Sequence, residues 1–154
     1  MSWRAAIDDL FTDYGWLLDN DKLEEWTGLF TESARYDVIP RENFDRGMPL
    51  CLIACRNRTM LRDRILALRV ANQFNIHHDR HVIGRSKIVE EGAGRARVET
   101  NYLVLQTDQG GSTKVFSAGA YRSVVVREDG AMRLAEQIVV VDTFCVPTLI
   151  ATPI

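Results

Sequence analysis

The fold is decided by residues 95–144, which read RARVETNYLVLQTDQGGSTKVFSAGAYRSVVVREDGAMRLAEQIVVVDTF. Apolar residues alternate with polar ones or form β-branched runs in three segments: Arg95–Thr107, Lys114–Arg127 and Arg133–Phe144. Turn sequences with glycine, at 108–111 and 128–130, separate these segments as in β-hairpins. The stretch therefore predicts three consecutive antiparallel strands, and Val82–Glu90 predicts another before them. Strands of this length suit a strongly curved sheet.

The amino-terminal side of this stretch predicts helices. Ser2 is a candidate N-cap for the first one. The apolar residues of that helix recur at intervals of three and four: Trp3, Ile7, Leu10, Tyr14 and Leu17. A shorter second helix is expected over Leu23–Phe30, after the turn-forming Asp19–Asp21. A third helix is expected from about Leu50 to Gln73.

Three helices followed by a strand meander predict an α+β fold. The helices are expected to pack on one concave face of a strongly curved, mainly antiparallel sheet, because each element has one apolar side to bury. Ala34–Ile39 adds a strand that ends at Pro40, and Gly119 is a candidate bend within a strand. A chain of 154 residues holds one core, so residues 1–154 are expected to form a single domain.

Composition and charge exclude several classes of function. The chain is 46% hydrophobic with a formal net charge of -2, which argues against a nucleic-acid or anionic-membrane surface. The longest apolar run, Met48–Cys55, is far shorter than the roughly 20 residues of a membrane-spanning helix. Three cysteines and an amino terminus unlike a signal peptide favour the cytoplasm.

All three histidines lie in one short cluster, His77-His78-Asp79-Arg80-His81. Two histidines and Asp79 could imitate a two-histidine, one-carboxylate iron site. However, neighbouring His77 and His78 would face apart in a helix or a strand. The cysteines also lack the spacing of a Rieske cluster or of common zinc sites. We therefore expect this chain to bind no metal.

A curved sheet wrapped around a helix can also enclose a catalytic pocket. Tyr14, Asp37, His81 and Glu136 are the titratable residues whose apolar neighbours would perturb their pKa values on burial. The alternative function is thus an independent isomerase or dehydratase that uses Tyr14, Asp37 or His81. The competing structural interpretation packs the Tyr14 ring into the core and exposes Asp37 to water.

Several motifs, in order along the chain, resemble one family. They are PRENFDRGMPLCLIACRNRTMLRDRILALR, RHVIGRSKIVE, NYLVLQT, KVFSAGAYRSVVV and MRLAEQIVVVDT. Together they resemble the small (beta) subunit of aromatic-ring-hydroxylating dioxygenases, the Rieske non-haem iron oxygenases. Met60–Arg64 and Arg80-His81 are the most specific parts. The resemblance is greatest to small subunits of enzymes that act on aromatic acids, such as terephthalate dioxygenase and salicylate 5-hydroxylase.

The resemblance implies a fold and a division of labour. The fold is a cystatin-like cone, shared with nuclear transport factor and ketosteroid isomerase. In this family the large alpha subunit carries the Rieske iron-sulfur cluster and the mononuclear Fe(II), and the small subunit holds an α3β3 hexamer together. The reaction uses O2 and electrons from NAD(P)H, and it makes the assembly an oxidoreductase. The resemblance implies no catalytic residue, cofactor or metal on this chain.

Two charged segments are the candidate docking sites for the alpha subunit. We interpret both the segment 40–49 and the segment 77–81 as loops. The predicted interface residues are Arg41, Phe44, Arg46, Arg80 and His81. Phe44 stands alone among charges, as an aromatic anchor does within a polar rim, although it could instead fold onto its own core. The apolar strand residues 138–141 favour beta-beta contacts through the outer sheet faces.

Overall fold

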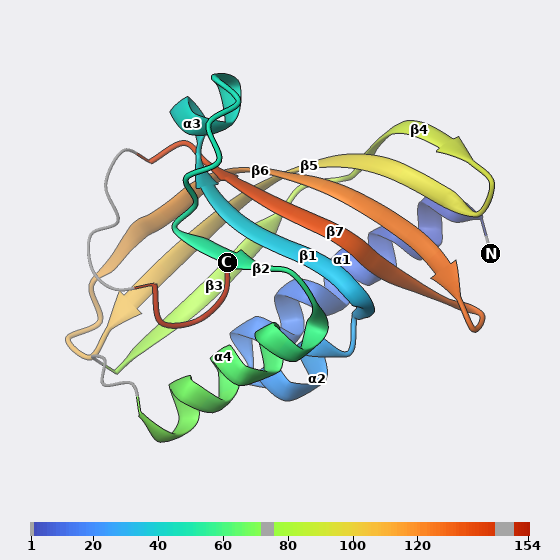
Figure 1. The fold of residues 1–154 in the computed structure, drawn as a ribbon. Coiled ribbons are helices and arrows are strands. Elements are labelled where there is room, and N and C mark those ends of the chain that lie inside the picture. Colours follow the sequence, from blue (N-terminus) through green and yellow to red (C-terminus); the bar gives the residue numbers. More distant parts are fainter. Residues whose placement is uncertain (1, 72–75, 144–149) are drawn as a thin grey trace.

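The computed structural model describes residues 2–71, 76–143 and 150–154. Its seven strands form one sheet in the order β2-β1-β7-β6-β5-β3, and β4 pairs with β5 beyond this path. The helices α1, α2 and α4 cover one face of this curved sheet, whereas α3 projects from one end (Figure 1). The α+β architecture predicted from the sequence is confirmed. No helix in these three ranges is long and apolar enough to cross a membrane.

The strands run antiparallel to their neighbours except for one pair. Their bounds are β1 Phe30–Pro40, β2 Ile53–Cys55, β3 His77–Ile83, β4 Lys87–Gly92, β5 Arg95–Asp108, β6 Thr113–Glu128 and β7 Ala131–Val141. The exception is β1, which runs parallel to β7 with Tyr36 opposite Gln137. The two hairpins β5–β6 and β6–β7 lie where the turn sequences predicted them. Phe144 and Cys145 lie outside the described residues.

The helices begin at capping residues. In α1 (Trp3–Asp19), the side chain of Ser2 accepts a hydrogen bond from the amide of Ala5, as the N-cap prediction requires. In α4 (Arg58–Val70), the side chain of Asn57 caps the amide of Met60. The predicted start near Leu50 is therefore wrong. The residues before the cap instead form β2, which pairs with β1.

Other boundaries also differ from the prediction. The second helix, α2, covers only Leu23–Thr27, and Phe30 already belongs to β1. The segment 40–49, expected to be a loop, contains the short helix α3 (Arg41–Asp45). The segment 77–81 is not a loop but most of β3, and the single strand expected at Val82–Glu90 is split between β3 and β4. β3 pairs with β5 over its whole length. The backbone pairing thus holds this segment in the sheet, although its polar side chains do not give the apolar pattern of a strand.

Aromatic rings fill the space between the helices and the sheet. Trp26 contacts Tyr14, Phe30 and Tyr36 edge-on, with ring centroids between 4.8 and 5.6 Å apart. Tyr121 stacks on Tyr102 at 4.6 Å. These six aromatic side chains are buried and form the centre of a cone whose wall is the sheet.

Gly119 permits the close approach of β6 to β7. A Cβ atom at this position would overlap the carbonyl oxygen of Val140 and would lie 3.2 Å from the ring of Tyr102. We therefore expect Gly119→Ala to lower the free energy of unfolding by about 3 kcal/mol, the upper part of the range for overpacking. Urea denaturation measures this. Gly92→Ala is the matched control, because a Cβ there meets nothing within 4 Å; equal losses in both variants would contradict the explanation.

Candidate functional site

The mouth of the cone is closed by residues 150–154 of the same chain. The hydroxyl of Tyr14 donates a hydrogen bond to the main-chain oxygen of Ile154 over 2.7 Å, and the hydroxyl of Tyr36 donates to the same atom over 3.1 Å. The amide of Ile154 in turn donates to the Tyr36 hydroxyl at 3.1 Å. Tyr14 and Tyr36 have no exposed surface. The predicted pocket residue Tyr14 is therefore engaged by the chain itself.

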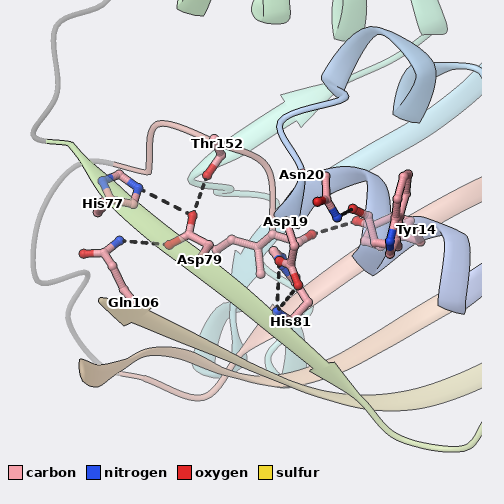
Figure 2. A network of polar contacts seen from close by, with 10 residues as sticks. Tyr14, Asp19, Asn20, His77, Asp79, His81, Gln106 and Thr152 are labelled. Carbon is pink, nitrogen blue, oxygen red and sulfur yellow. Dashed lines mark hydrogen bonds and ion pairs between the residues drawn. The ribbon is translucent and has the colours of Figure 1, made fainter. Parts of the chain in front are cut away.

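Asp79 holds the middle of this segment (Figure 2). The hydroxyl of Thr152 donates to Oδ2 of Asp79 over 2.9 Å, and the side-chain amide of Gln106 donates to Oδ1 over 3.3 Å. Nε2 of His77 lies 3.5 Å from Asp79 Oδ2. On α4, Arg64 donates to the carbonyl of Ile150 over 3.4 Å. Groups from four elements, α1, β1, β3 and α4, thus hold residues 150–154 across the mouth.

Burial changes the acidity of every tyrosine in the chain. Desolvation raises the pKa of Tyr14 and of Tyr121 well above the ordinary value, and it also raises the pKa of Tyr36 and of Tyr102. The neutral phenol is therefore the stable form inside the cone. The hydroxyls of Tyr14 and Tyr36 act there as hydrogen-bond donors to Ile154.

His81 is held by Asp19 at the end of α1. Its ring atom Nδ1 lies 2.7 Å from Oδ1 of Asp19, and its backbone amide donates to both carboxylate oxygens at 3.0 Å (Figure 2). A carboxylate only accepts, so Nδ1 carries the proton. Nε2 of His81 has no hydrogen-bond partner within the described ranges. The imidazole lines a surface hollow of about 430 Å³ between α1 and β3.

Asp37 and Glu136 lie on the outer face of the sheet, away from the cone. The carboxylate of Asp37 is fully buried, 2.6 Å from Nη2 of Arg35 and 2.5 Å from Nη1 of Arg56. Arg35 also lies 3.7 Å from Glu136. The competing interpretation, in which Asp37 faces water, is thus wrong, because two guanidinium groups cover it. Tyr14, Asp37 and His81 do not converge on one pocket.

The histidine cluster does not form a metal site in the described part of the chain, where no group of three or more His, Cys, Asp or Glu side chains has the arrangement to hold an ion. As their adjacent positions predict, β-strand alternation turns His77 and His78 to opposite faces of β3. His77, Asp79 and His81 share the less exposed face. There Asp79 and His81 are engaged with Thr152 and Asp19.

Most of the predicted docking residues lie at the surface. Arg41 and Arg46 are exposed on or next to α3, where Arg41 pairs with Asp142 at 3.2 Å. Phe44 is partly buried and lines a hollow of about 410 Å³ on the outer sheet face, together with Ile138. Arg80 is exposed on β3, whereas the side chain of His81 is 1% exposed.

Sequence reasoning missed the two groups that organise the site. The sequence indicates only a turn at Asp19, and residues 150–154 carry no periodic pattern. Thr152 and Asp79 are 73 residues apart, and Tyr14 and Ile154 are 140 apart. The local spacing of residue types gives no information on contacts between residues so far apart in the sequence.

Comparison with known proteins identifies the family. Residues 1–137 match the SnoaL-like domain. The chain is 43% identical to the anthranilate 1,2-dioxygenase small subunit of Burkholderia cepacia, over 89% of this chain and 85% of that one. It is 36% identical to subunit beta 2 of the terephthalate 1,2-dioxygenase terminal oxygenase component of Comamonas sp, over 92% of each.

A solved structure agrees with these relatives. The crystal structure of a Novosphingobium aromaticivorans chain, assigned as the beta subunit of an aromatic-ring-hydroxylating dioxygenase, superposes with a TM-score of 0.91 at 40% identity, over 98% of this chain and 96% of that one. The family resemblance and the cystatin-like cone inferred from the sequence are both confirmed. The chain belongs to the small (beta) subunits of aromatic-ring-hydroxylating dioxygenases.

Proposed function

We propose that this chain is the non-catalytic, structural beta subunit of a terminal oxygenase component that acts on an aromatic carboxylic acid. The observation that carries the proposal is the 43% identity to a dioxygenase small subunit over most of both chains. The substrate class is supported by relatives named for anthranilate and terephthalate, which are both aromatic acids. The structural role is supported by the cone, whose mouth is filled by residues 150–154 and whose Tyr14 hydroxyl is already bonded.

In this proposal the catalytic alpha subunit is the partner, in a cytoplasmic α3β3 hexamer with beta-beta contacts through the outer sheet faces. The alpha subunit holds the Rieske cluster and the mononuclear Fe(II), and it uses O2 with electrons from NAD(P)H. In this assembly the chain contributes the contact surfaces that hold the subunits together. The outer face of its long β5–β6–β7 meander offers the ion pair of Arg122 with Glu99 and apolar side chains such as Ile138 for such contacts.

The metal content of the separated subunits tests the division of labour. We expect this chain, expressed alone and desalted, to contain no stoichiometric iron and to show no visible absorption. The complex with the alpha subunit is expected to contain iron and to absorb visible light. Oxygenation of an aromatic acid is expected only from the complex. Metal analysis and absorption spectroscopy measure this. A stoichiometric cluster in the pure beta chain would overturn the proposal.

The docking surface is proposed to centre on α3. Arg41, Phe44 and Arg46 place one aromatic side chain among exposed charges. Arg80 is exposed on β3, which β7, β6 and β5 separate from β1, so it is proposed as a second, separate contact. The side chain of His81 lies too deep to serve as a direct contact. In this proposal it contributes by fixing β3 to α1 through Asp19.

Replacement of Phe44 tests this surface. We expect Phe44→Ala to weaken alpha-beta association by about 2 kcal/mol, the level of an interface hot spot, with little change in the melting temperature of the isolated chain. Association is measured by surface plasmon resonance against the alpha subunit. Leu66→Ala is the control, because Leu66 is an apolar surface residue on α4, outside the proposed docking surface. A large loss of thermal stability with unchanged affinity would place Phe44 in the core of its own domain.

A further inference from the structure

A surface hollow of about 430 Å³ lies between α1 and the segment from His81 to Ser86. We propose that this hollow binds a small aromatic acid that carries a hydrogen-bond donor next to its carboxylate, as ortho-aminobenzoate does. Sites for small molecules have volumes of about 300 Å³ or more, so the hollow has room for one substituted benzene ring. The inference goes beyond the proposed structural role and does not depend on it.

Apolar side chains give the hollow a surface for an aromatic ring. Gly15 lets α1 lie directly on β3, because an added Cβ atom there would come to 3.0 Å from Cδ1 of Ile83. Ile83 and Phe11 both line the hollow. Trp16 also lines it and is 54% exposed, so its indole offers an open surface on which a ligand ring can stack.

The position of Trp16 on α1 directs such a ring toward a polar end. Asp8, Thr12 and Trp16 follow one another at helical spacing, so they lie along the same side of α1 and all line the hollow. Side chains of a helix lean toward its N-terminus, so Trp16 leans toward Thr12 and Asp8. A ring against Trp16 can therefore point its substituents along the hollow toward Asp8.

The pair of Asp8 and Arg85 determines which substituents fit. Nε of Arg85 lies 4.0 Å from Oδ2 of Asp8, and the side chain of Arg85 is 76% exposed. The guanidinium thus keeps donors for a carboxylate, which it can bind through two parallel hydrogen bonds. The neighbouring carboxylate of Asp8 only accepts, so it selects an N–H or O–H donor. A ligand with a carboxylate and a donor on adjacent ring positions matches this adjacent donor and acceptor.

The other charges around the hollow are compatible with an anionic ligand. Arg4 lies one turn before Asp8 and donates to the carbonyl oxygen of Ser86 over 3.0 Å, which adds a second cation at this end. At the other end Asp19 is already engaged, because its two oxygens accept hydrogen bonds from the backbone amide of His81 and Oδ1 also contacts Nδ1 of that residue (Figure 2). The Asp8 end therefore carries two positive charges and one negative charge, which favours a ligand carboxylate there.

Titration of the full-length, isotope-labelled chain with ortho-aminobenzoate tests this site by NMR spectroscopy. We expect saturable shifts of the Gly15 and Gly84 amides, which lie in the walls of the hollow, with a dissociation constant of about 1 mM or lower. Arg85→Gln should weaken binding about tenfold, because it removes charge-assisted hydrogen bonds. Trp16→Leu should weaken it about threefold, because it removes the ring contact. para-Aminobenzoate should bind about fivefold more weakly, because its amino group cannot reach Asp8 while its carboxylate is on Arg85.

The matched control is Arg62→Gln on α4, because Arg62 is also an exposed arginine but lies outside the hollow. It should leave the affinity for ortho-aminobenzoate unchanged. The proposal is overturned if neither glycine amide shows a saturable shift, if para-aminobenzoate binds as tightly as ortho-aminobenzoate, or if Arg85→Gln weakens binding no more than Arg62→Gln does. The amide spectrum verifies that each variant is folded. All these measurements use this chain alone and its affinity for a ligand, so a negative result leaves the iron test of the proposed function unaffected.

Discussion

Above about pH 10 the protein is expected to lose stability steeply, by about 5 kcal/mol of unfolding free energy per pH unit. All four tyrosines of the chain, Tyr14, Tyr36, Tyr102 and Tyr121, have pKa values raised by burial. In the unfolded chain they ionise near the ordinary pKa of about 10. The unfolded state then binds fewer protons than the folded state, so each tyrosine lowers stability by about 1.4 kcal/mol per pH unit.

The raised pKa values determine both the direction of this change in stability and the pH range in which it occurs. Below pH 10 both states hold the phenolic protons and the contribution is fully present; it is lost as the pH rises toward the raised folded values. We expect tyrosinate absorption to appear only together with cooperative unfolding. Tyr102→Phe keeps the ring stacked on Tyr121 and should reduce the slope by about a quarter. Gradual tyrosinate formation near pH 10 in a chain with native circular dichroism would contradict the prediction.

Removal of both arginines around Asp37 is expected to have the next largest effect. Asp37 is fully buried, whereas Arg35 and Arg56 are about half exposed. Each single replacement by methionine should cost about 1 kcal/mol, because the other guanidinium still neutralises the carboxylate. The double variant Arg35→Met/Arg56→Met should cost about 3 kcal/mol or more, because it leaves a buried carboxylate without a cation.

A double-mutant cycle in urea measures this coupling. Asp37→Asn added to the double variant should recover most of the lost stability, because it removes the uncompensated charge. Losses that are small and simply additive, with no recovery by Asp37→Asn, would show that the carboxylate does not depend on its two arginines.

Helix α1 and the two hairpins were predictable because their signals are local. The apolar spacing from Trp3 to Leu17 and the turn residues at 128–130 each determine structure within a few residues. β3 was not predictable in the same way. Its inward-facing residues, His77, Asp79 and His81, are polar, so the strand lacks the apolar alternation of its neighbours. Their hydrogen-bond partners come from distant parts of the chain: Thr152 donates to Asp79, and Asp19 binds His81.

The contacts of the candidate site were likewise not predictable from local sequence patterns. The sequence identified Tyr14, Asp37 and Glu136 as titratable residues beside apolar ones, but alternation alone does not say which face of a strand is inside the cone. It also cannot indicate that Arg35 and Arg56 would cover Asp37, or that residues 150–154 would return to Tyr14. The residue pattern predicted the α+β class with its curved sheet, whereas the family resemblance supplied the cystatin-like cone and the subunit class.

The parallel pairing of β1 with β7 has a consequence for biosynthesis. β1 ends at Pro40, and its partner begins only at Ala131, so this edge of β1 stays unpaired until most of the polypeptide has left the ribosome. Contacts of such separation are slow to form because a long loop must close first. The apolar faces of the early helices meanwhile lack the strands that cover them. The nascent chain is thus expected to complete its sheet only once β7 has left the ribosome, and to need protection from aggregation until then.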